Sequence, residues 1–285
     1  MKKEGKAWSK VQKVKRITIH IGLHRTGTSF LQKHLLKNLP EVALIMGWYS
    51  HRQIMNVNLE SHLVISDEVL SGRLWGKKYL EDFYLNIKKI IKLYGNPKII
   101  FGIRNQETFI PSVYKQYLHE KGYKDFNFFF NINNNGIRKM EDFLLMPKIN
   151  YLKDNFTDVF IYSQKDLQSR QGDFLSALSE FMELKQEIIL PKYVKKKENV
   201  GVNTSLQVNI LKKFNYVNSK LEQIHPNLSL YSKVFRKLGI TPRHICQDYL
   251  KNLKSQNFEI PSKYKEYIRE QYKNDWNSAS KTVSF

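Results

Sequence analysis

The chain has 285 residues, which is enough for one large domain or two small ones, and a fold of this size buries roughly 75% of the surface that its unfolded chain exposes. No segment approaches the ~18 uninterrupted apolar residues of a membrane span, and the single cysteine, Cys246, excludes an intramolecular disulfide. A net charge of +21 predicts attraction to an anion, whether nucleic acid, an acidic membrane face, an acidic polysaccharide or a phosphate-rich nucleotide, although a merely solubilising surface rich in Lys is an alternative.

The first segment, Met1–Arg16, carries seven Lys or Arg residues against one Glu. It lacks the apolar stretch that a secretory signal has after its basic start. We therefore expect a basic tail ahead of the folded domain and a cytoplasmic location, in keeping with the single cysteine.

Five short apolar runs rich in β-forming residues alternate with segments of helical periodicity. The predicted strands are Ile17–Ile21, Val42–Met46, Leu63–Ser66, Lys98–Ile103 and Asp158–Tyr162. The predicted crossover helices are Thr28–Asn38, Tyr79–Tyr94 and Gln106–Lys121. This alternation predicts an α/β fold with a parallel sheet of about five strands flanked by helices.

Helical patterns replace strands beyond about residue 165. They cover Asp173–Leu184, Ser205–Glu222, Arg243–Leu253 and Ser262–Trp276. We expect a single domain over 17–285, with an α/β core at 17–165 and a mostly helical cap or extension at 166–285.

The first predicted strand leads into a loop with glycines at Gly22 and Gly27. Their spacing is that of a P-loop, in which backbone N–H groups and a helix N-terminus surround a phosphate, although a plain strand-to-helix turn is an alternative. The ATPase form of this loop has Lys directly after the second glycine, where this chain has Thr28. Here the cation, Arg25, lies inside the loop, and the hydroxyls of Thr28 and Ser29 follow the glycine.

A second phosphate-binding pattern follows the strand Lys98–Ile103. Arg104 stands directly after that strand, and Ser112 comes eight residues later within the next predicted helix. A guanidinium makes bidentate, charge-assisted hydrogen bonds to a phosphate, and a hydroxyl supplies a further donor.

These two blocks resemble the sulfotransferases that use 3′-phosphoadenosine 5′-phosphosulfate (PAPS), whose bacterial members carry His-Lys-Thr-Gly-Thr-Thr where this chain has His-Arg-Thr-Gly-Thr-Ser. The two departures, Arg25 and Ser29, preserve the chemistry. The resemblance implies a nucleotide-binding core that holds PAPS as co-substrate, with Arg104 and Ser112 on its 3′-phosphate. It assigns the 5′-phosphosulfate loop to His24, Arg25, Thr26, Gly27, Thr28 and Ser29.

A third, looser match covers Lys195–Ser205. In many sulfotransferases a basic loop late in the chain closes over the 3′ end of the nucleotide, and the resemblance extends this role to Lys197 and Asn203. A solvated charged loop is the alternative reading of this segment.

The implied reaction is in-line transfer of a sulfuryl group, which requires stabilisation of the charge on the leaving oxygen and removal of a proton from the acceptor hydroxyl. We assign the first role to Arg25 and the second to Glu68, because an apolar strand delivers Glu68 to its carboxyl end. Asp67 or a histidine are alternative bases, and either carboxylate has the alternative role of capping the next helix or pairing with Arg73.

The histidines considered as bases are His20, His24 and His62. No His, Cys or carboxylate set has convincing metal-ligand spacing, so no metal is expected.

Two other functions fit parts of the sequence. A P-loop kinase or ATPase would use Leu63–Glu68 to position magnesium, but Thr28 in place of Lys argues against it. A basic module for nucleic acid or an anionic surface would use Lys2–Arg16 and Lys192–Lys197. By analogy we expect a carbohydrate acceptor and peripheral contact with an anionic membrane surface, without specific nucleic-acid binding.

Overall fold

The structure is a computed structural model that describes residues 14–47, 61–73, 78–186, 188, 204–225, 229–230, 235, 237–238, 241–246 and 256–285. These residues form two compact units. Unit 1 comprises the described residues up to Gln106, those of 141–196, and Tyr272–Phe285, and unit 2 comprises Glu107–Met140 and the described residues of 197–271. The single-domain assignment with a boundary near residue 165 stays a prediction.

Unit 1 is built on a sheet of five parallel strands, as the sequence predicts. The strands are β1 (Ile17–Gly22), β2 (Val42–Met46), β3 (His62–Ser66), β4 (Lys98–Ile103) and β5 (Val159–Ser163). Each begins and ends within one residue of its predicted bounds. Strands buried on both faces read as continuous apolar runs, which explains why they stand out in the sequence.

The strand order is β2-β3-β1-β4-β5, so β1 lies at the centre. Ile19 of β1 is paired with Ile65 of β3 on one side and with Ile99 of β4 on the other. The chain leaves β1 toward one edge of the sheet and later crosses β1 to build the other edge. In open α/β sheets, ligands bind at the carboxyl ends of the strands where the order reverses in this way. The loops after β1, β3 and β4 lie at these carboxyl ends of the strands.

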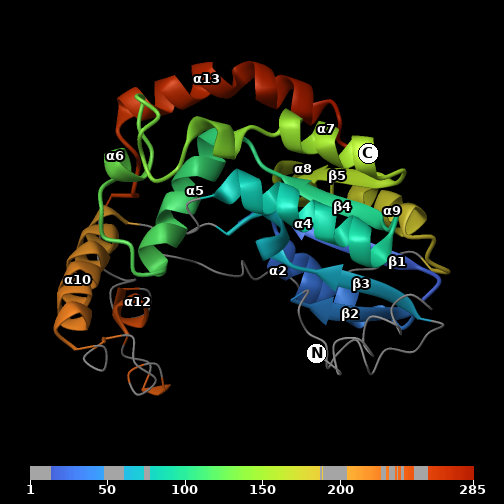
Figure 1. The fold of residues 1–285 in the computed structure, drawn as a ribbon, viewed down its shortest axis with the longest axis horizontal. Coiled ribbons are helices and arrows are strands. Elements are labelled where there is room, and N and C mark those ends of the chain that lie inside the picture. Colours follow the sequence, from blue (N-terminus) through green and yellow to red (C-terminus); the bar gives the residue numbers. More distant parts are fainter. Residues whose placement is uncertain are drawn as a thin grey trace. The chain divides into compact units, whose positions relative to one another are not determined.

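Helices cover both faces of this sheet (Figure 1). Those of unit 1 are α2 (Thr28–Phe30), η1 (Leu31–Leu35), η2 (Leu36–Asn38), η3 (Glu68–Ser71), α4 (Tyr79–Tyr94), α7 (Met146–Asn155), α8 (Gln164–Ser169) and α9 (Gln171–Phe181). On one face, η1 and α9 bury Leu31 and Phe174 in one cluster with Ile100. On the other, Phe83 of α4 packs against Phe101, with ring centroids 6.3 Å apart. The result is a three-layer α/β/α core.

The last residues of the chain protect an edge of the sheet. Ser284 N donates to Ile161 O over 2.9 Å, and Ile161 N donates to Ser284 Oγ over 2.9 Å. Phe285 stacks on Phe160 with an interplanar angle of 9°. These contacts cover β5, whose unpaired edge would otherwise be open to another strand.

Unit 2 is helical. It contains α5 (Gln106–His119) from Glu107 onward, α6 (Phe126–Phe129), α10 (Ser205–Ile224), α12 (Pro242–His244) and the first part of α13 (Ser262–Ser280), while η4 (Met140–Phe143) begins at its boundary. Its core is aromatic: Phe126 lies 5.2 Å from Tyr114 and 5.1 Å from Tyr264 between ring centroids.

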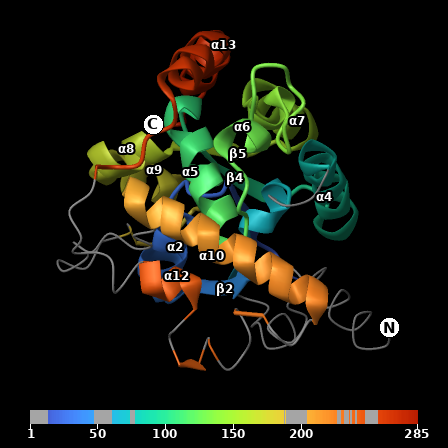
Figure 2. The ribbon, with the colours of Figure 1, turned by 90° about the vertical axis from the view of Figure 1, so that its left-hand side faces the viewer.

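Helix α10 is the longest helix of unit 2 among the described residues and runs unbroken (Figure 2). It begins with a capping box in which Thr204 and Gln207 satisfy each other's backbone N–H groups. On its buried side, Asn215 Nδ2 donates to the carbonyls of Leu118 and Gly122, both over 2.7 Å. The predicted helix Arg243–Leu253 lies for the most part outside the described residues. None of the described helices combines the length and apolar character needed to cross a membrane.

Candidate anion-binding site

The loop after β1 is a tight turn with two left-handed residues. Arg25 has φ of 67° and Gly27 has φ of 97°. A non-glycine residue in this region stores strain of about 1–3 kcal/mol and is typical of functional sites. A turn of this kind directs successive backbone N–H groups to one side, which forms a concave site for an anion.

The two glycines of the loop are fixed by close packing. A Cβ atom on Gly22 would lie 2.0 Å from Thr28 Oγ1, and a Cβ on Gly27 would lie 2.7 Å from Leu167 Cδ2. Gly22 must therefore lack a side chain so that the helix start can fold back over the end of β1. The glycine spacing seen in the sequence follows from this geometry.

The helical segment after the loop begins without a side-chain cap, because Gly27 occupies the N-cap position. The first N–H groups of a helix have no partner inside the helix and attract an anion. Thr28 Oγ1 is also buried at this helix start, beside the side chains of Glu68 and Tyr162.

Arg104 lies directly after β4 and contacts the loop. Its Nη1 donates a hydrogen bond to the backbone carbonyl of Arg25 over 3.1 Å. Burial, and then the positive charge of Arg25, lower the pKa of Arg104 to about 10, so the guanidinium stays charged at neutral pH. Two cations held close together at a partly buried position repel each other, and an anion between them relieves that repulsion.

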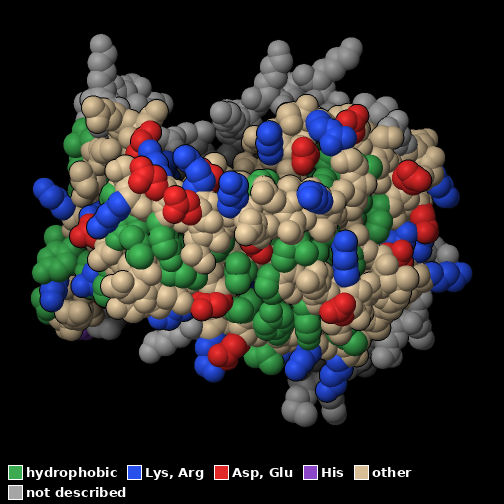
Figure 3. All heavy atoms as spheres, turned by 90° about the horizontal axis from the view of Figure 1, so that it is seen from above, with side chains coloured by type: hydrophobic (Ala, Val, Ile, Leu, Met, Phe, Trp, Pro, Cys, Tyr) green, Lys and Arg blue, Asp and Glu red, His purple; other side chains and the backbone are tan. Residues whose placement is uncertain are grey.

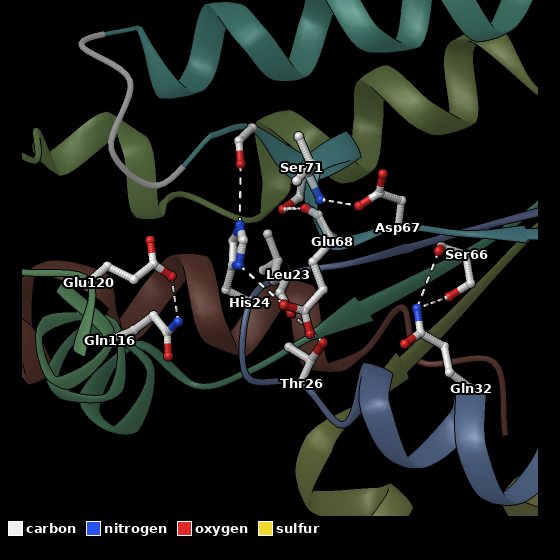
Figure 4. A network of polar contacts seen from close by, with 12 residues as sticks. Leu23, His24, Thr26, Gln32, Ser66, Asp67, Glu68, Ser71, Gln116 and Glu120 are labelled. Atoms are coloured by element: carbon white, nitrogen blue, oxygen red, sulfur yellow. Dashed lines mark hydrogen bonds and ion pairs between the residues drawn. The ribbon is translucent and has the colours of Figure 1, made fainter. Parts of the chain in front are cut away.

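The two carboxylates after β3 have different positions. Asp67 caps η3, since its side chain accepts a hydrogen bond from Val69 N over 2.9 Å. Glu68 instead reaches the loop after β1, where its Oε2 lies 3.3 Å from His24 Nδ1 (Figure 4). The capping role that the sequence left open for either residue thus belongs to Asp67, while Glu68 faces the loop.

His24 lies between two hydrogen-bond acceptors. Its Nδ1 faces the Glu68 carboxylate, and its Nε2 faces the backbone carbonyl of Gly72 over 3.3 Å. Burial of Glu68 raises its pKa, but the hydrogen bond and charge of His24 outweigh this effect, and the pKa is lowered from its usual value. Glu68 is therefore a carboxylate at neutral pH.

A buried polar network joins the strands that lead to the site. This network was not predicted from the sequence. His20 of β1 bonds to Ser66 Oγ through Nδ1 over 2.8 Å and to the Tyr162 hydroxyl through Nε2 over 3.0 Å. Gln32 Nε2 donates to Ser66 Oγ over 3.0 Å (Figure 4). Burial lowers the pKa of His20 to about 4, so this ring is neutral and serves as a connector between strands.

A glycine inside β4 makes this network possible. A Cβ on Gly102 would lie 2.5 Å from the Tyr162 hydroxyl, so the ring crosses β4 only because that position has no side chain. A glycine inside a strand often marks such a close approach, and it was the one sequence signal for the network.

Most of the predicted nucleotide residues lie together. His24, Arg25, Thr26, Gly27, Thr28 and Ser29 form the loop and the helix start, and Arg104 and Glu68 contact this loop. Thr26 has a local role as well, because its hydroxyl donates to Leu23 O over 2.6 Å. The catalytic and binding roles of all these residues stay predictions.

The other predicted site residues lie away from this loop or outside the described residues. Ser112 lies in the second turn of α5, in unit 2. Lys197 and Asn203 lie outside the described residues. His62 is buried at the start of β3, with its Nε2 bonded to Thr18 Oγ1 over 2.7 Å, so it belongs to the sheet and not to the site at the strand ends. Across the described ranges, no group of three or more His, Cys, Asp or Glu side chains is arranged to hold a metal ion.

The fold and these contacts define an α/β protein with a phosphate-loop-like turn after its central strand. No protein-family model and no curated protein sequence matches the chain. The chain is similar to the crystal structure of a sulfotransferase from Alicyclobacillus acidocaldarius, with 12% sequence identity and a TM-score of 0.47, over 74% of this chain and 96% of that one. We infer function from the residues of the site itself.

Proposed function

We propose that this chain is a PAPS-dependent sulfotransferase. The proposal rests on two cations that lie at one loop, which leads into a helix without a side-chain cap. Arg25 is part of the loop, and Arg104 is hydrogen-bonded to the Arg25 carbonyl. A nucleotide with separate anionic groups on its 5′ and 3′ ends matches such a pair, because each cation can compensate one group.

The fit to the nucleotide can be stated residue by residue. The N–H groups of the turn and the hydroxyls of Thr28 and Ser29 would hold the 5′-phosphosulfate, and the absence of a side-chain cap at Gly27 supports this role. Arg104 would hold the 3′-phosphate. A guanidinium has five N–H donors, so the bond to the Arg25 carbonyl and a bidentate phosphate contact are compatible.

In the proposed reaction the acceptor oxygen attacks the sulfur of PAPS, and the bond between that sulfur and the phosphate oxygen breaks. The sulfuryl group moves to the acceptor, and adenosine 3′,5′-bisphosphate leaves with the electron pair of the broken bond. Arg25 stabilises the negative charge that develops on the leaving phosphate oxygen, a contribution whose removal typically costs on the order of 10²–10³ in rate.

Glu68 takes the proton of the acceptor hydroxyl. It is ionised at neutral pH, as the lowered pKa indicates, and it lies at the loop and not in a cap. In this scheme His24 orients the carboxylate by its contact at 3.3 Å, so we assign it to positioning Glu68 besides its predicted place in the nucleotide loop.

A kinase or ATPase is the nearest rival function. The carboxylate that would position magnesium in such an enzyme corresponds to Asp67, which here is engaged in capping η3. Thr28 also replaces the lysine that follows the second glycine in ATPases. Both features favour sulfuryl transfer over phosphoryl transfer.

For the acceptor we propose a hydroxyl of a carbohydrate, since a chain with net charge +21 suits an anionic saccharide. We further propose a cytoplasmic enzyme that needs no metal for this transfer, because Arg25 and the turn supply the charge compensation that magnesium gives to nucleoside triphosphates.

A thermal-shift measurement with adenosine 3′,5′-bisphosphate tests the proposal. At about 100 times its dissociation constant the ligand should stabilise the native protein by ~2.7 kcal/mol and raise the Tm by roughly 4–5 °C. Arg104→Ala should lose most of the shift, whereas Lys153→Ala, an exposed cation on α7, should keep it. A shift with magnesium and ATP but none with the bisphosphate would favour the kinase.

A further inference from the structure

The solvent side of α10 in unit 2 is unusual in combining apolar and basic side chains without acidic ones. The exposed residues of this helix are Leu206, Asn209, Lys213, Tyr216, Val217, Lys220, Gln223 and Ile224. At 100° per residue they fall on one side of the helix, which we call the outer face of α10. Tyr216, Val217 and Ile224 are 50%, 48% and 75% exposed. Such exposure is uncommon for three apolar neighbours on a soluble helix.

The acidic residue of α10 is turned away from this face. Glu222 accepts hydrogen bonds from Lys121 Nζ over 2.7 Å and from Ser229 Oγ over 2.6 Å. Lys213 and Lys220 have no acidic partner within 4 Å among the described residues. The outer face therefore carries net positive charge. On the face of the molecule shown in Figure 3, basic and acidic side chains are interspersed.

Residues of the α5–α6 connection and of α6 extend the outer face. The rings of Tyr123 and Tyr216 lie 5.6 Å apart. The ammonium of Lys124 lies 5.1 Å from the Tyr123 ring centroid and 5.2 Å from that of Phe128. Lys220 lies 5.7 Å from the Tyr216 ring centroid. Aromatic and lysine side chains are thus in continuous contact from Phe128 to Lys220.

We propose that the outer face of α10, with Tyr123, Lys124 and Phe128 at its flank, binds peripherally to the surface of an anionic lipid bilayer. Interfacial helices present lysines to anionic headgroups and place aromatic and aliphatic side chains at the boundary with the acyl chains. Tyrosine is enriched at that depth, since its ring is apolar and its hydroxyl polar. A soluble polyanion such as RNA or an acidic polysaccharide would compensate the lysines but would leave Val217 and Ile224 in water. The proposal does not depend on sulfuryl transfer.

Sedimentation of the full chain with vesicles tests the proposal. We expect binding to phosphatidylcholine vesicles that contain phosphatidylserine and little binding to phosphatidylcholine alone. The variant Lys213→Glu/Lys220→Glu/Val217→Ser should bind on the order of tenfold or more weakly, because two attractive charges are reversed. The matched control Lys88→Glu/Lys89→Glu/Leu85→Ser makes the same changes on exposed residues of α4 and should bind normally. Equal loss in both variants, or no loss in the first, would overturn the proposal.

A labelling experiment separates lipid contact from attraction by charge alone. An environment-sensitive fluorophore on Val217→Cys, in a Cys246→Ala background, should shift to shorter wavelength when anionic vesicles are added. The same label on Leu85→Cys, a position of similar exposure on α4, should not shift. If a soluble acidic polysaccharide or RNA produced the shift at Val217 and vesicles did not, the occupant would be a soluble polyanion and the proposal would be wrong.

Discussion

The guanidinium of Arg104 and the backbone carbonyl of Arg25 are joined by a 3.1 Å hydrogen bond, which ties the end of β4 to the turn after β1. The bond accounts for two features at once. It supports the left-handed backbone of Arg25, and it holds two cations beside the uncapped helix start. The loop is thereby ordered before any ligand arrives, which lowers the cost of binding an anion.

The close approach of Thr28 to Gly22 predicts that Thr28→Ala restores part of the stability that Gly22→Ala loses. Gly22→Ala would force a Cβ to within 2.0 Å of Thr28 Oγ1, and overpacking of this kind typically costs about 1–3 kcal/mol. Thr28→Ala removes that oxygen, and the next atoms lie 3.3 Å away. Urea unfolding of both single variants and the double variant should show that the double variant loses less than the sum of the two. Additive losses would mean that the clash is not the cause.

The buried histidines predict acid sensitivity. Burial lowers the pKa of His20 and of His62 to about 4, from 6.5 in the unfolded chain. Between pH 6.5 and 4 the unfolded state therefore binds more protons, so the free energy of unfolding falls as the pH falls, by roughly 3 kcal/mol per histidine at pH 4.

Urea unfolding between pH 7.5 and 4.5 measures this dependence. His20→Asn is expected to reduce the slope by about half, whatever its effect on stability at pH 7.5, because one of the two protons taken up on unfolding is gone. An unchanged slope would show that His20 is protonated in the native protein.

The sequence predicted the strands well and the polar network poorly, for physical reasons. Strands such as β4 are buried on both faces and so appear as continuous apolar runs. The bond from Arg104 to the Arg25 carbonyl, by contrast, is made to backbone, and a sequence pattern shows only side chains. The network around His20 joins residues as far apart as Ser66 and Tyr162, and its pairing depends on strand order, which short motifs do not encode.

The roles of Asp67 and Glu68 illustrate the same limit. Their neighbouring positions after β3 left open which one caps the helix and which one faces the loop. The answer depends on the backbone at Asp67, which is extended and so points its carboxylate at Val69 N. No alternation of residue types in the sequence distinguishes these two neighbours.

Substitution of Glu68 tests its proposed role as base. Glu68→Gln should lower kcat for sulfuryl transfer by roughly 10²–10⁴ and leave the affinity for adenosine 3′,5′-bisphosphate nearly unchanged. Because the pKa of Glu68 lies below its usual value, protonation of this group should not limit the activity at any pH above the usual glutamate pKa at which the protein stays folded. Asp67→Asn is the matched control, since asparagine also caps helices well. Equal losses of kcat in both variants would assign the base elsewhere.

Asp275 is predicted to hold the C-terminal part of α13 within unit 1. Its carboxylate accepts hydrogen bonds from Gln106 Nε2 (2.7 Å), Leu145 N (2.8 Å) and Met146 N (3.0 Å), so it also caps the start of α7. Asp275→Ala should lower the free energy of unfolding by roughly 2–3 kcal/mol, because buried donors lose a charged acceptor. Asp173→Ala, which removes an exposed ion pair with Arg170, should have little effect in the same urea titration.

The most direct test asks whether Arg104 binds the 3′-phosphate of a nucleotide whose 5′ end lies in the turn. Calorimetric titration should compare adenosine 3′,5′-bisphosphate with adenosine 5′-monophosphate on the native protein and on Arg104→Gln, whose amide can still donate to the Arg25 carbonyl. We expect the substitution to weaken the bisphosphate on the order of 10- to 100-fold and to leave the monophosphate nearly unchanged. Equal affinities of the native protein for both nucleotides, or equal losses for both in the variant, would contradict the sulfotransferase assignment.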